Sequence, residues 1–383
     1  MSKNINNKKL HIAMIGHKQV PSRDGGVEVV VWELATRLQK AGFEVDCYNR
    51  SGKINNCEAP SKVNGKKGKY LNGIRIITVP TFPDVSFNAA IYTFFATIRA
   101  LFGHYDVIHY HAEGPCLMIW LPKLFGIKTV ATIHGLDWQR AKWNKFASWM
   151  IKIGEKRAAK YADEIIVLSK SVQQYFIDTY GRHTHFIPNG IMRPAIRKPN
   201  IITKDYGLIG NDYIMTLCRI VPEKGIHYLL KAYKQIDTNK KLVIAGNSSN
   251  AANYMQLIEK LAAEDDRVIM TGLVTGDKLQ ELLSNAYLYV LPSDIEGMSI
   301  SLLEAMSYGN ACLVSDIEEN TDVVDEYAAT FNKGSVEDLK DKLIKLLGDS
   351  NEVNKYKREA SDFICNKYDW DVMTKDTISI YVS

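Results

Sequence analysis

The sequence lacks the features that mark secreted, metal-held or membrane-spanning chains. Its cysteines are few, scattered and without a C-x-x-C pair: Cys47, Cys57, Cys116, Cys218, Cys312 and Cys365. This spacing argues against a disulfide framework or a zinc site and fits free thiols in a reducing compartment. No stretch approaches the roughly 20 apolar residues that cross a bilayer, and the apolar run at residues 12–15 is too short for a signal peptide. We therefore expect a cytoplasmic protein, with the inner face of the cell membrane as a second location.

A strong charge of one sign is also missing. The formal net charge is only +5 over 383 residues, and no basic stripe favours nucleic-acid binding. Lysines do gather between residues 53 and 69, among glycines and asparagines. That stretch predicts a solvated loop, and a patch for anionic phospholipid is the alternative.

Short apolar runs alternate with segments of helical period along the whole chain, which predicts βαβ units and mostly parallel sheets. The break is residues 193–211, which hold two prolines and little periodicity and read as a linker. In the first half we expect strands at residues 10–15, 45–48, 74–79, 107–110, 129–133, 165–168 and 186–187. In the second half we expect strands at residues 213–217, 241–245, 267–270, 288–291 and 311–314.

The predicted fold class is therefore α/β, with two doubly wound Rossmann-like domains facing a cleft. We place the first domain at residues 1–195 and the second at residues 196–365. Residues 366–383 are expected to form a helix that packs back on the first domain. In open α/β sheets ligands bind at the carboxyl ends of strands, so the residues after each strand are the candidates for a site.

The most informative segment follows the strand predicted at residues 288–291. It contains two glutamates eight residues apart around a glycine-containing loop that runs into a helix: Glu296, Gly297, Met298, Ser299, Ile300 and Glu304. Backbone N–H groups at a helix N-terminus favour a phosphate, and carboxylates accept hydrogen bonds from sugar hydroxyls. The alternative is an ordinary capped helix with Glu304 facing solvent.

Cations and glycines follow two other strands. Arg219 and Lys224, with Gly225, come after the strand at residues 213–217 and suit a diphosphate, although surface cations would look the same. Gly25 and Gly26 come after the first strand and allow close backbone approach at a helix start. They form neither the G-x-G-x-x-G motif nor a P-loop, so the sequence does not support a dehydrogenase or kinase function. The alternative is that the two glycines form an ordinary tight turn.

Histidines mark the remaining strand ends. His134 ends the strand at residues 129–133, where a catalytic and a structural role are equally compatible with the sequence. His109 and His111 share one face of another strand, but no third ligand can be placed, so we predict no metal site. Two acidic triplets, at residues 294–296 and 369–371, imitate metal-binding motifs of a different sugar-transferase architecture.

Together these motifs, in this order, resemble the family 4 retaining glycosyltransferases of GT-B fold over essentially the whole chain. The matching blocks are E-G-x₆-E-A-M at Glu296, Arg219 with Lys224-Gly225, Ile187-Pro188-Asn189-Gly190, and His134-Gly135. The opening, from Ile15-Gly16-His17 to Gly25-Gly26-Val27-Glu28, resembles bacterial rhamnosyltransferases of polysaccharide assembly. Family members often carry phenylalanine after the Glu-Gly, whereas this chain has Met298.

The resemblance implies a role for each candidate. Arg219 and Lys224 would hold the donor diphosphate, with backbone contacts from Gly25 and Gly26, and His134 would lie near the sugar and acceptor. Glu296 would bind the donor sugar and Glu304 the ribose. The remaining donor-binding candidates are Asn189, Gly272, Leu273 and Val274, the last three near the base, and Gly297, Met298, Ser299 and Ile300 near phosphate or sugar.

The expected activity is metal-independent, retaining transfer of a hexosyl group from a UDP- or dTDP-sugar, without a cofactor. A glycan or a polyprenyl-diphosphate-linked sugar would be the acceptor, and the apolar stretch at residues 87–102 is either a membrane-facing or a core helix. Retention would come from front-face attack or, alternatively, from a covalent intermediate; the lack of a residue that stands out as a nucleophile favours front-face attack. A nucleotide-sugar epimerase and a non-catalytic nucleotide-sugar binder are the alternatives.

Overall fold

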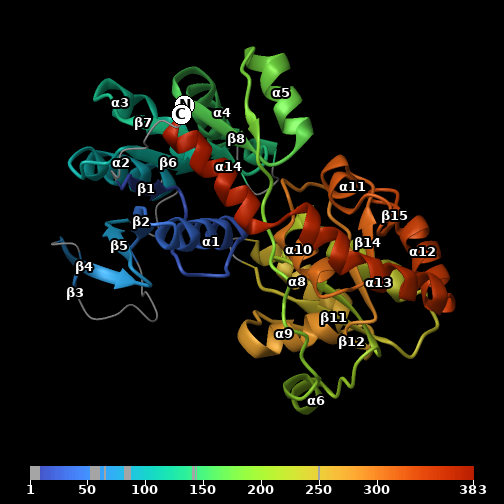
Figure 1. The fold of residues 1–383 in the computed structure, drawn as a ribbon. Coiled ribbons are helices and arrows are strands. Elements are labelled where there is room, and N and C mark those ends of the chain that lie inside the picture. The colour runs from blue at the N-terminus through green and yellow to red at the C-terminus, as the bar shows by residue number, and fades with distance from the viewer. Residues whose placement is uncertain are drawn as a thin grey trace, which may run out of the picture. The chain divides into compact units, whose positions relative to one another are not determined.

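The computed structural model describes residues 9–51, 61–63, 66–81, 88–139, 143, 145–248 and 251–383. They form two compact units (Figure 1). The first unit contains the described residues up to Pro188 together with Asp371–Ser383, and the second contains Asn189–Trp370. The final helix of the chain therefore belongs to the first unit.

The first unit is built on a nine-stranded sheet with the order β3-β4-β5-β2-β1-β6-β7-β8-β9. Strand β4 is antiparallel to β3 and β5, and the other neighbouring pairs are parallel. The strands are β1 (His11–Ile15), β2 (Glu44–Arg50), β3 (Ser61–Val63), β4 (Lys66–Leu71), β5 (Ile74–Val79), β6 (Val107–His111), β7 (Lys128–Ile133), β8 (Glu164–Val167) and β9 (His185–Phe186).

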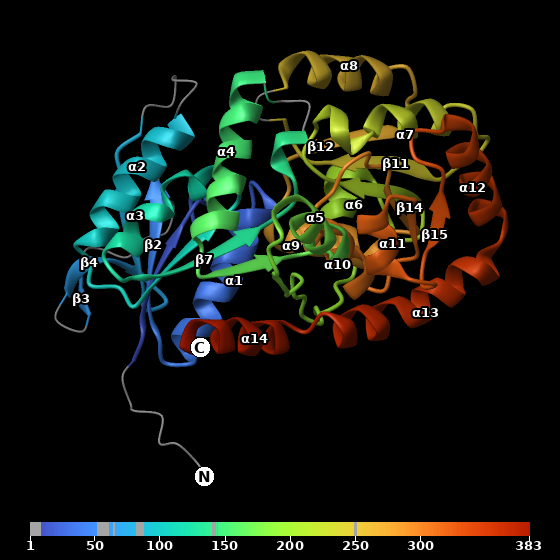
Figure 2. The ribbon, with the colours of Figure 1, turned by 90° about the horizontal axis from the view of Figure 1, so that it is seen from above.

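Helices connect these strands and cover both faces of the sheet (Figure 2). The helices are α1 (Gly26–Lys40), α2 (Asn88–Leu101), α3 (Trp120–Leu124), α4 (Lys145–Tyr161), α5 (Lys170–Tyr180) and the final α14 (Trp370–Val382), with 3₁₀ turns η1 (Gly114–Met118) and η2 (Asp137–Gln139). The return of α14 to this unit confirms the prediction from the sequence. Its first turn reaches α1 through an ion pair of 3.5 Å between Arg37 Nε and Asp371 Oδ1.

The second unit has a six-stranded sheet with the order β12-β11-β10-β13-β14-β15, and its neighbouring strands are parallel. The strands are β10 (Tyr213–Leu217), β11 (Lys241–Ala245), β12 (Val268–Gly272), β13 (Leu288–Leu291), β14 (Cys312–Ser315) and β15 (Ala329–Phe331). The helices are α6 (Ile201–Tyr206), α7 (Ile226–Tyr233), α8 (Ala252–Ala262), α9 (Gly276–Asn285), α10 (Ile300–Ser307), α11 (Glu318–Val324), α12 (Val336–Gly348) and α13 (Ser350–Lys367), with a 3₁₀ turn η3 (Pro222–Lys224).

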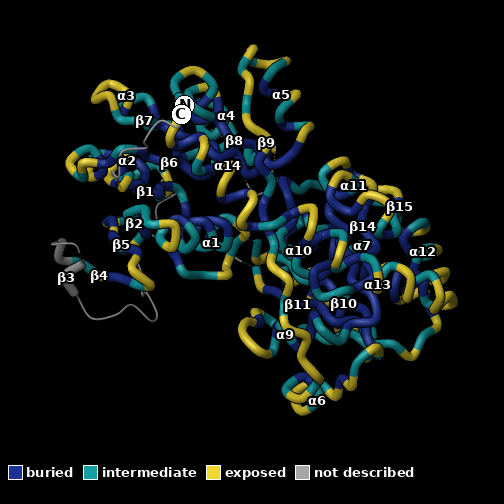
Figure 3. The backbone as a smooth tube through the Cα atoms, viewed as in Figure 1, coloured by how far each residue is buried: buried dark blue, intermediate teal, exposed yellow. Residues whose placement is uncertain are grey.

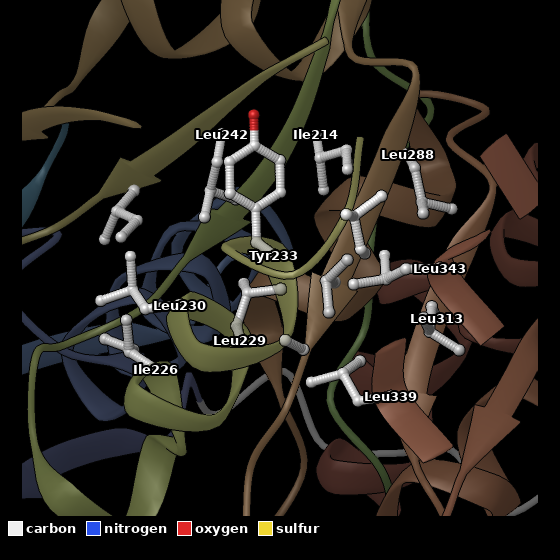
Figure 4. Close-up of a cluster of buried hydrophobic side chains, with 14 of the residues drawn as sticks. Ile214, Ile226, Leu229, Leu230, Tyr233, Leu242, Leu288, Leu313, Leu339 and Leu343 are labelled. Carbon is white, nitrogen blue, oxygen red and sulfur yellow. The ribbon is translucent and has the colours of Figure 1, made fainter. Parts of the chain in front are cut away.

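The second unit packs α7 and α12 on the centre of its sheet (Figure 4). The apolar face of α7 presents Ile226, Leu229 and Tyr233 to Ile214 of β10 and Leu242 of β11. All five side chains are fully buried, and burying each one contributes roughly 1.5–3 kcal/mol. The same separation of a buried sheet from exposed helix faces runs through both units (Figure 3). This rigid core fixes where the loops after β10 and β13 emerge.

Each sheet has a point at which the strand order reverses. In the first unit the chain builds outward from β1 to β2 and then resumes on the other side of β1 with β6. In the second unit it builds outward from β10 to β12 and then resumes beside β10 with β13. Loops diverge at such points, which is where open α/β sheets bind ligands.

The structure corrects two expectations. Residues 193–211 are not simply a linker, because they contain α6, whose N-terminal amides at Asn200 and Ile202 bond to Glu281 of α9. The lysine-rich stretch is not one loop either, since it includes β3 and the basic strand β4; residues 52–60 of it, with Cys57, lie outside the described residues. The other five cysteines are free thiols.

Candidate donor-binding and catalytic site

The loops after β10 and β13 are held together by a close backbone approach. Gly225, which caps α7, has φ +63°, and a Cβ atom there would lie 2.0 Å from the carbonyl oxygen of Pro292. The Asp294 N–H also donates a 2.9 Å hydrogen bond to the Glu223 carbonyl. Only glycine combines this dihedral with this contact. Gly225 therefore brings the cation-bearing loop against the glutamate-bearing loop.

Lys224 and Glu296 meet at this junction as an ion pair between Lys224 Nζ and Glu296 Oε1. The side chains are 14% and 6% exposed, respectively. Ser293 Oγ donates a further 2.7 Å hydrogen bond to the same carboxylate oxygen. A pair this buried is strongly coupled, since losing one partner leaves the other charge desolvated. The sequence predicted different ligands for these residues, the donor diphosphate for Lys224 and the donor sugar for Glu296. In this structure the two side chains bind each other.

Arg219 lies beside them at the end of β10 and is partly buried. Within the part of the chain that the structure describes, its guanidinium has no hydrogen bond and no carboxylate partner. A cation kept at a strand end without a counter-ion attracts an anion, and a guanidinium matches phosphate oxygens in a two-pronged way. Arg219 therefore offers the clearest anion-binding group of the second unit.

The N-terminus of α10 adds backbone donors to the same edge of the sheet. Ser299 is its N-cap, with the hydroxyl accepting from Leu302 N at 3.4 Å. The amides just before the first turn point along the helix axis, where the dipole favours negative charge. Glu304 lies on the next turn and is partly buried.

Asn189 packs against this loop from the start of the second unit. Its backbone N–H donates to Met298 Sδ at 3.1 Å, and its Nδ2 reaches the Met298 carbonyl at 3.5 Å. Both residues are buried, and Asn189 Oδ1 has no hydrogen-bond partner among the described residues. Neighbouring Gly190 is required for another reason, because a Cβ there would lie 2.5 Å from the Trp370 ring. The contact places Asn189 beside the glycine loop that contains Met298. Both residues are among the predicted donor-binding candidates.

The predicted base-binding segment follows β12 on the same edge of the sheet. Gly272 has φ +66°, Leu273 is 54% exposed and Val274 is buried. Between β12 and β10, the turn after β11 approaches so closely that a Cβ on Gly246 would lie 1.8 Å from the Cys218 carbonyl oxygen. The second unit therefore gathers the candidates that follow β10, β12 and β13 along one edge of one sheet.

In the first unit, Gly25 is the N-cap of α1 in extended backbone, with no side-chain cap. Glu28 of the first turn folds back instead: its Oε1 accepts from Lys18 N at 2.8 Å, and a Cβ on Gly25 would lie 2.5 Å from its Oε2. An acidic side chain is stabilised at a helix N-terminus. The Glu28 carboxylate thus lies at the helix N-terminus where Gly25 and Gly26 are predicted to contact phosphate.

His134 follows β7 and is 8% exposed. Its Nε2 lies 3.2 Å from Nδ1 of His111, the last residue of β6. Among the described residues, no group of three or more histidines, cysteines or acids is arranged to hold a metal ion.

Two buried glutamates, Glu113 and Glu155, accept hydrogen bonds from the loop after His134. The sequence patterns did not single them out. Glu113 Oε2 accepts from Asp137 N at 2.7 Å, and Glu155 Oε2 accepts from Trp138 Nε1 at 2.9 Å. Burial first, then the hydrogen bond with Glu155 and the charges of Asp137 and Glu155, raises the pKa of Glu113 well above 4.5. Burial opposes ionisation of Glu155 as well, but hydrogen bonds from Glu113 and two tyrosines lower its pKa. These opposite directions favour a protonated Glu113 beside an ionised Glu155.

Comparison with known proteins assigns the chain to a family. The family model described as Glycosyltransferase Family 4 matches residues 24–192, and the one described as Glycosyl transferases group 1 matches residues 202–363. The glycosyltransferase MJ1607 of Methanocaldococcus jannaschii is 30% identical over 401 residues, which cover 97% of this chain and 98% of that relative. The chain belongs to glycosyltransferase family 4.

A solved structure and a further relative extend this result. Sucrose-phosphate synthase from Thermosynechococcus elongatus superimposes with a TM-score of 0.83 at 21% identity, over 97% of this chain and 98% of that one, which confirms the predicted GT-B fold. The UDP-Gal:alpha-D-GlcNAc-diphosphoundecaprenol alpha-1,3-galactosyltransferase of Escherichia coli is 27% identical over 237 residues, 57% of this chain. The match spans about three fifths of the length of that enzyme and of one other curated relative.

Proposed function

We propose that this protein is a retaining, metal-independent hexosyltransferase of bacterial surface-polysaccharide synthesis. Its donor would be a UDP- or dTDP-sugar, with rhamnose as one candidate sugar. The observation that carries the proposal is Arg219, a partly buried cation without a partner in the described chain, next to the Lys224–Glu296 pair. Two fixed cations beside helix amides can stabilise a leaving diphosphate, which is the charge-stabilising task that other transferases give to a metal.

Donor binding would rearrange the ion pair. A diphosphate oxygen would replace the Glu296 carboxylate at Lys224 Nζ, and Glu296 would then accept hydrogen bonds from the sugar hydroxyls. The acceptor oxygen would attack the anomeric carbon on the face from which the diphosphate departs, and a donor phosphate oxygen would take the acceptor proton. The carbon–oxygen bond to the phosphate breaks as the new glycosidic bond forms.

A donor screen tests this function. Purified protein is incubated with UDP-, dTDP- and GDP-sugars in EDTA, and nucleotide release is measured with and without a membrane lipid extract. We expect release from one donor that depends on the extract, and a Lys224→Ala loss of at least about tenfold. Lys234→Ala is the matched control, because Lys234 also forms an ion pair, with Glu264, but on an exposed surface. Sugar conversion without an acceptor would instead indicate an epimerase, and turnover unaffected by Lys224→Ala would refute the diphosphate role.

The proposed acceptor is a glycan or a polyprenyl-diphosphate-linked sugar, as the name of the E. coli relative indicates for that enzyme. A lipid-linked acceptor requires contact with an anionic membrane surface, and α4 has a suitable face. Phe146 and Trp149 are 50% and 56% exposed, and Lys145, Lys156 and Lys160 are exposed on the same helix. The only acidic residue of α4 is the buried Glu155, so its exposed charge is entirely positive. Such a face suits anionic headgroups.

Helix α2 of the same unit also exposes aromatic side chains. Its buried residues are mostly small, including Ala96 and Ala100, while Phe94, Phe95 and Phe102 are 46%, 43% and 78% exposed. Tyr92 belongs to the core of the first unit, whereas these three phenylalanines are exposed to solvent; Phe87 lies outside the described residues. None of the described helices is long and apolar enough to span a bilayer, and the surface would serve peripheral docking.

Flotation with phosphatidylglycerol vesicles tests the docking surface. The triple variant Lys145→Glu, Lys156→Glu, Lys160→Glu is expected to lose most vesicle binding. The control reverses three exposed lysines of the second unit, Lys231, Lys234 and Lys260, and should bind like the original protein. Equal flotation of both variants would remove α4 as the docking face. No vesicle binding by the original protein would remove the membrane contact and favour a soluble glycan as the acceptor.

A further inference from the structure

The loop after β14 is tied to the loop that carries Glu296. Strands β13 and β14 are parallel neighbours, with Leu291 opposite Val314 at their carboxyl ends. Directly after them, the Ser315 hydroxyl donates a 2.5 Å hydrogen bond to the carbonyl of Ser293. Both serines are fully buried. The two loops therefore leave the sheet side by side, so that side chains of both can face one ligand.

The same Ser315 fixes where the next helix begins. Asn320 Nδ2 donates to Ser315 Oγ at 3.0 Å and to the Ser315 carbonyl at 3.3 Å. The Asn320 N–H donates to the carbonyl of Ile317 at 2.9 Å, and Asn320 is fully buried. These bonds hold the first turn of α11. The position of Glu319, directly before Asn320, is thus set by the serine that also contacts the loop after β13.

Glu319 is partly buried, whereas Glu318, one residue earlier, is exposed. Among the described residues, the Glu319 carboxyl group forms no ion pair and no hydrogen bond with another residue. A carboxyl group that is partly removed from water is unfavourable unless a ligand or the remaining solvent supplies hydrogen-bond donors. Glu319 therefore has hydrogen-bonding capacity that the described protein does not use.

The charge of Glu296 acts on this carboxyl group. Burial is the main cause that raises the pKa of Glu319; its own backbone N–H lowers the pKa, and the charges of Glu318 and Glu296 raise it again. A like charge has this effect when it lies nearby. Two carboxyl groups from neighbouring loops are therefore close enough to repel each other.

Glu296 also has an oxygen that the protein leaves unused. Its Oε1 accepts from Lys224 Nζ and from Ser293 Oγ, whereas no described residue donates to its Oε2. In the proposed mechanism Lys224 moves to the diphosphate, which leaves Glu296 without its cation. A sugar bound there would then face two carboxyl groups, those of Glu296 and Glu319.

We propose that Glu319 is a specificity-determining residue of the donor site and, together with Glu296, accepts hydrogen bonds from hydroxyls of the transferred sugar. Hydroxyls of an uncharged sugar can donate to both carboxylates. A uronic acid would instead bring a third negative charge into a partly buried site, where repulsion is strong. The transferred group is therefore an uncharged hexosyl group and not a hexuronosyl group. This inference rests on the proposed transferase function and names the sugar class of its donor.

Donors that differ only at C6 test this selection. The full protein is titrated calorimetrically, in EDTA, with UDP-glucose and UDP-glucuronic acid and with UDP-galactose and UDP-galacturonic acid. UDP and dTDP alone measure what the nucleotide contributes, and dTDP-glucose and dTDP-glucuronic acid replace the UDP-sugars if only dTDP binds. We expect each neutral donor to bind at least about tenfold more tightly than its uronic acid partner. Glu319→Gln keeps the size of the side chain but removes its charge, and should shrink this ratio at least about threefold.

Glu318→Gln is the matched control, because it removes the same charge from the exposed neighbouring residue and should leave the ratio within about twofold. The unfolding midpoint checks the environment of Glu319 without any ligand. Because the pKa of Glu319 is raised in the folded protein, ionisation there costs stability, and Glu319→Gln should gain stability over the original protein as the pH rises above about 4.5.

The outcomes separate this inference from the proposed function. A uronic acid donor that binds as tightly as its neutral partner would overturn the inference while leaving the transferase function in place. Equal effects of Glu319→Gln and Glu318→Gln on the ratio would do the same. A protein that binds neither UDP nor dTDP would refute the donor site itself, and with it both the proposed function and the inference that rests on it.

Discussion

The backbone N–H of Asn189 donates a hydrogen bond to the sulfur of Met298, at 3.1 Å. This bond ties the start of the second unit to the glycine loop before α10, at a position where family members often have phenylalanine. A phenylalanine ring offers no comparable in-plane acceptor, so the methionine gives the buried amide a partner that the aromatic residue would not.

Met298→Leu removes this acceptor with little change in volume. We expect the free energy of unfolding of the second unit to fall by about 1–2 kcal/mol, because a buried N–H is left without a partner. Thermal or urea unfolding measures the loss. Met306→Leu is the matched control, since Met306 is also buried but has no hydrogen bond to its sulfur among the described residues. Equal losses in both variants would mean that the Met298 sulfur contributes only packing.

The ion pair between Lys224 and Glu296 predicts that stability and turnover separate. Lys224→Ala should lower the unfolding midpoint as well as activity, because it leaves a buried carboxylate without its cation. Adding Glu296→Gln removes that uncompensated charge and should restore most of the midpoint while activity stays low. A double variant that recovers turnover would show that neither side chain acts on the donor.

Gly225 and Gly276 separate a backbone clash from backbone strain. Both have positive φ, +63° and +60°, but only a Cβ on Gly225 would meet another atom, the Pro292 carbonyl oxygen. Gly276→Ala should cost about 1–2 kcal/mol for the left-handed conformation alone. Gly225→Ala should cost about 3 kcal/mol or more and reduce turnover, because the Lys224 loop must move away from the Glu296 loop. Similar unfolding midpoints for the two variants would contradict the close approach.

The opposite pKa shifts of Glu113 and Glu155 predict a pH dependence of stability. The pKa of Glu113 is raised in the folded protein, so its contribution is complete below about pH 4.5 and is lost as the pH rises through its folded pKa. Glu113→Gln keeps an acceptor for Asp137 N and a donor for Glu155 without titrating. The midpoint of the original protein minus that of this variant should therefore fall as the pH rises above about 4.5 and through the folded pKa of Glu113.

Glu155→Gln provides the contrast. The pKa of Glu155 is lowered, so its ionised form contributes stability above about pH 4.5 that is lost as the pH falls through its folded pKa. Replacing it weakens the acceptor of Trp138, Tyr175 and Tyr180 and should destabilise the protein at neutral pH. A parallel pH profile of the original protein and Glu113→Gln would show that Glu113 does not hold the proton.

Much of the fold could be read from local patterns. Strands β5, β10, β11 and β13 have the predicted limits, and most other strands lie within one or two residues of them. Parallel strands buried on both faces leave continuous apolar runs, and glycines mark where helices begin or end. The exceptions are informative: α6 is short and gains its order from Glu281, and β4 is a lysine-rich edge-region strand without an apolar run.

The sequence by itself determined which residues follow strand ends, and therefore the chemistry of the candidate groups: Arg219, Lys224, Glu296 and His134. Only the tertiary structure decided their partners, because partners depend on strand order and not on period. Lys224 and Glu296 are 72 residues apart, and Asn189 and Met298 are 109 apart. Lys224 and Glu296 meet because β13 pairs with β10 and not with β12, its predecessor in the chain. The same holds for His111 and His134, whose rings meet because β6 pairs with β7.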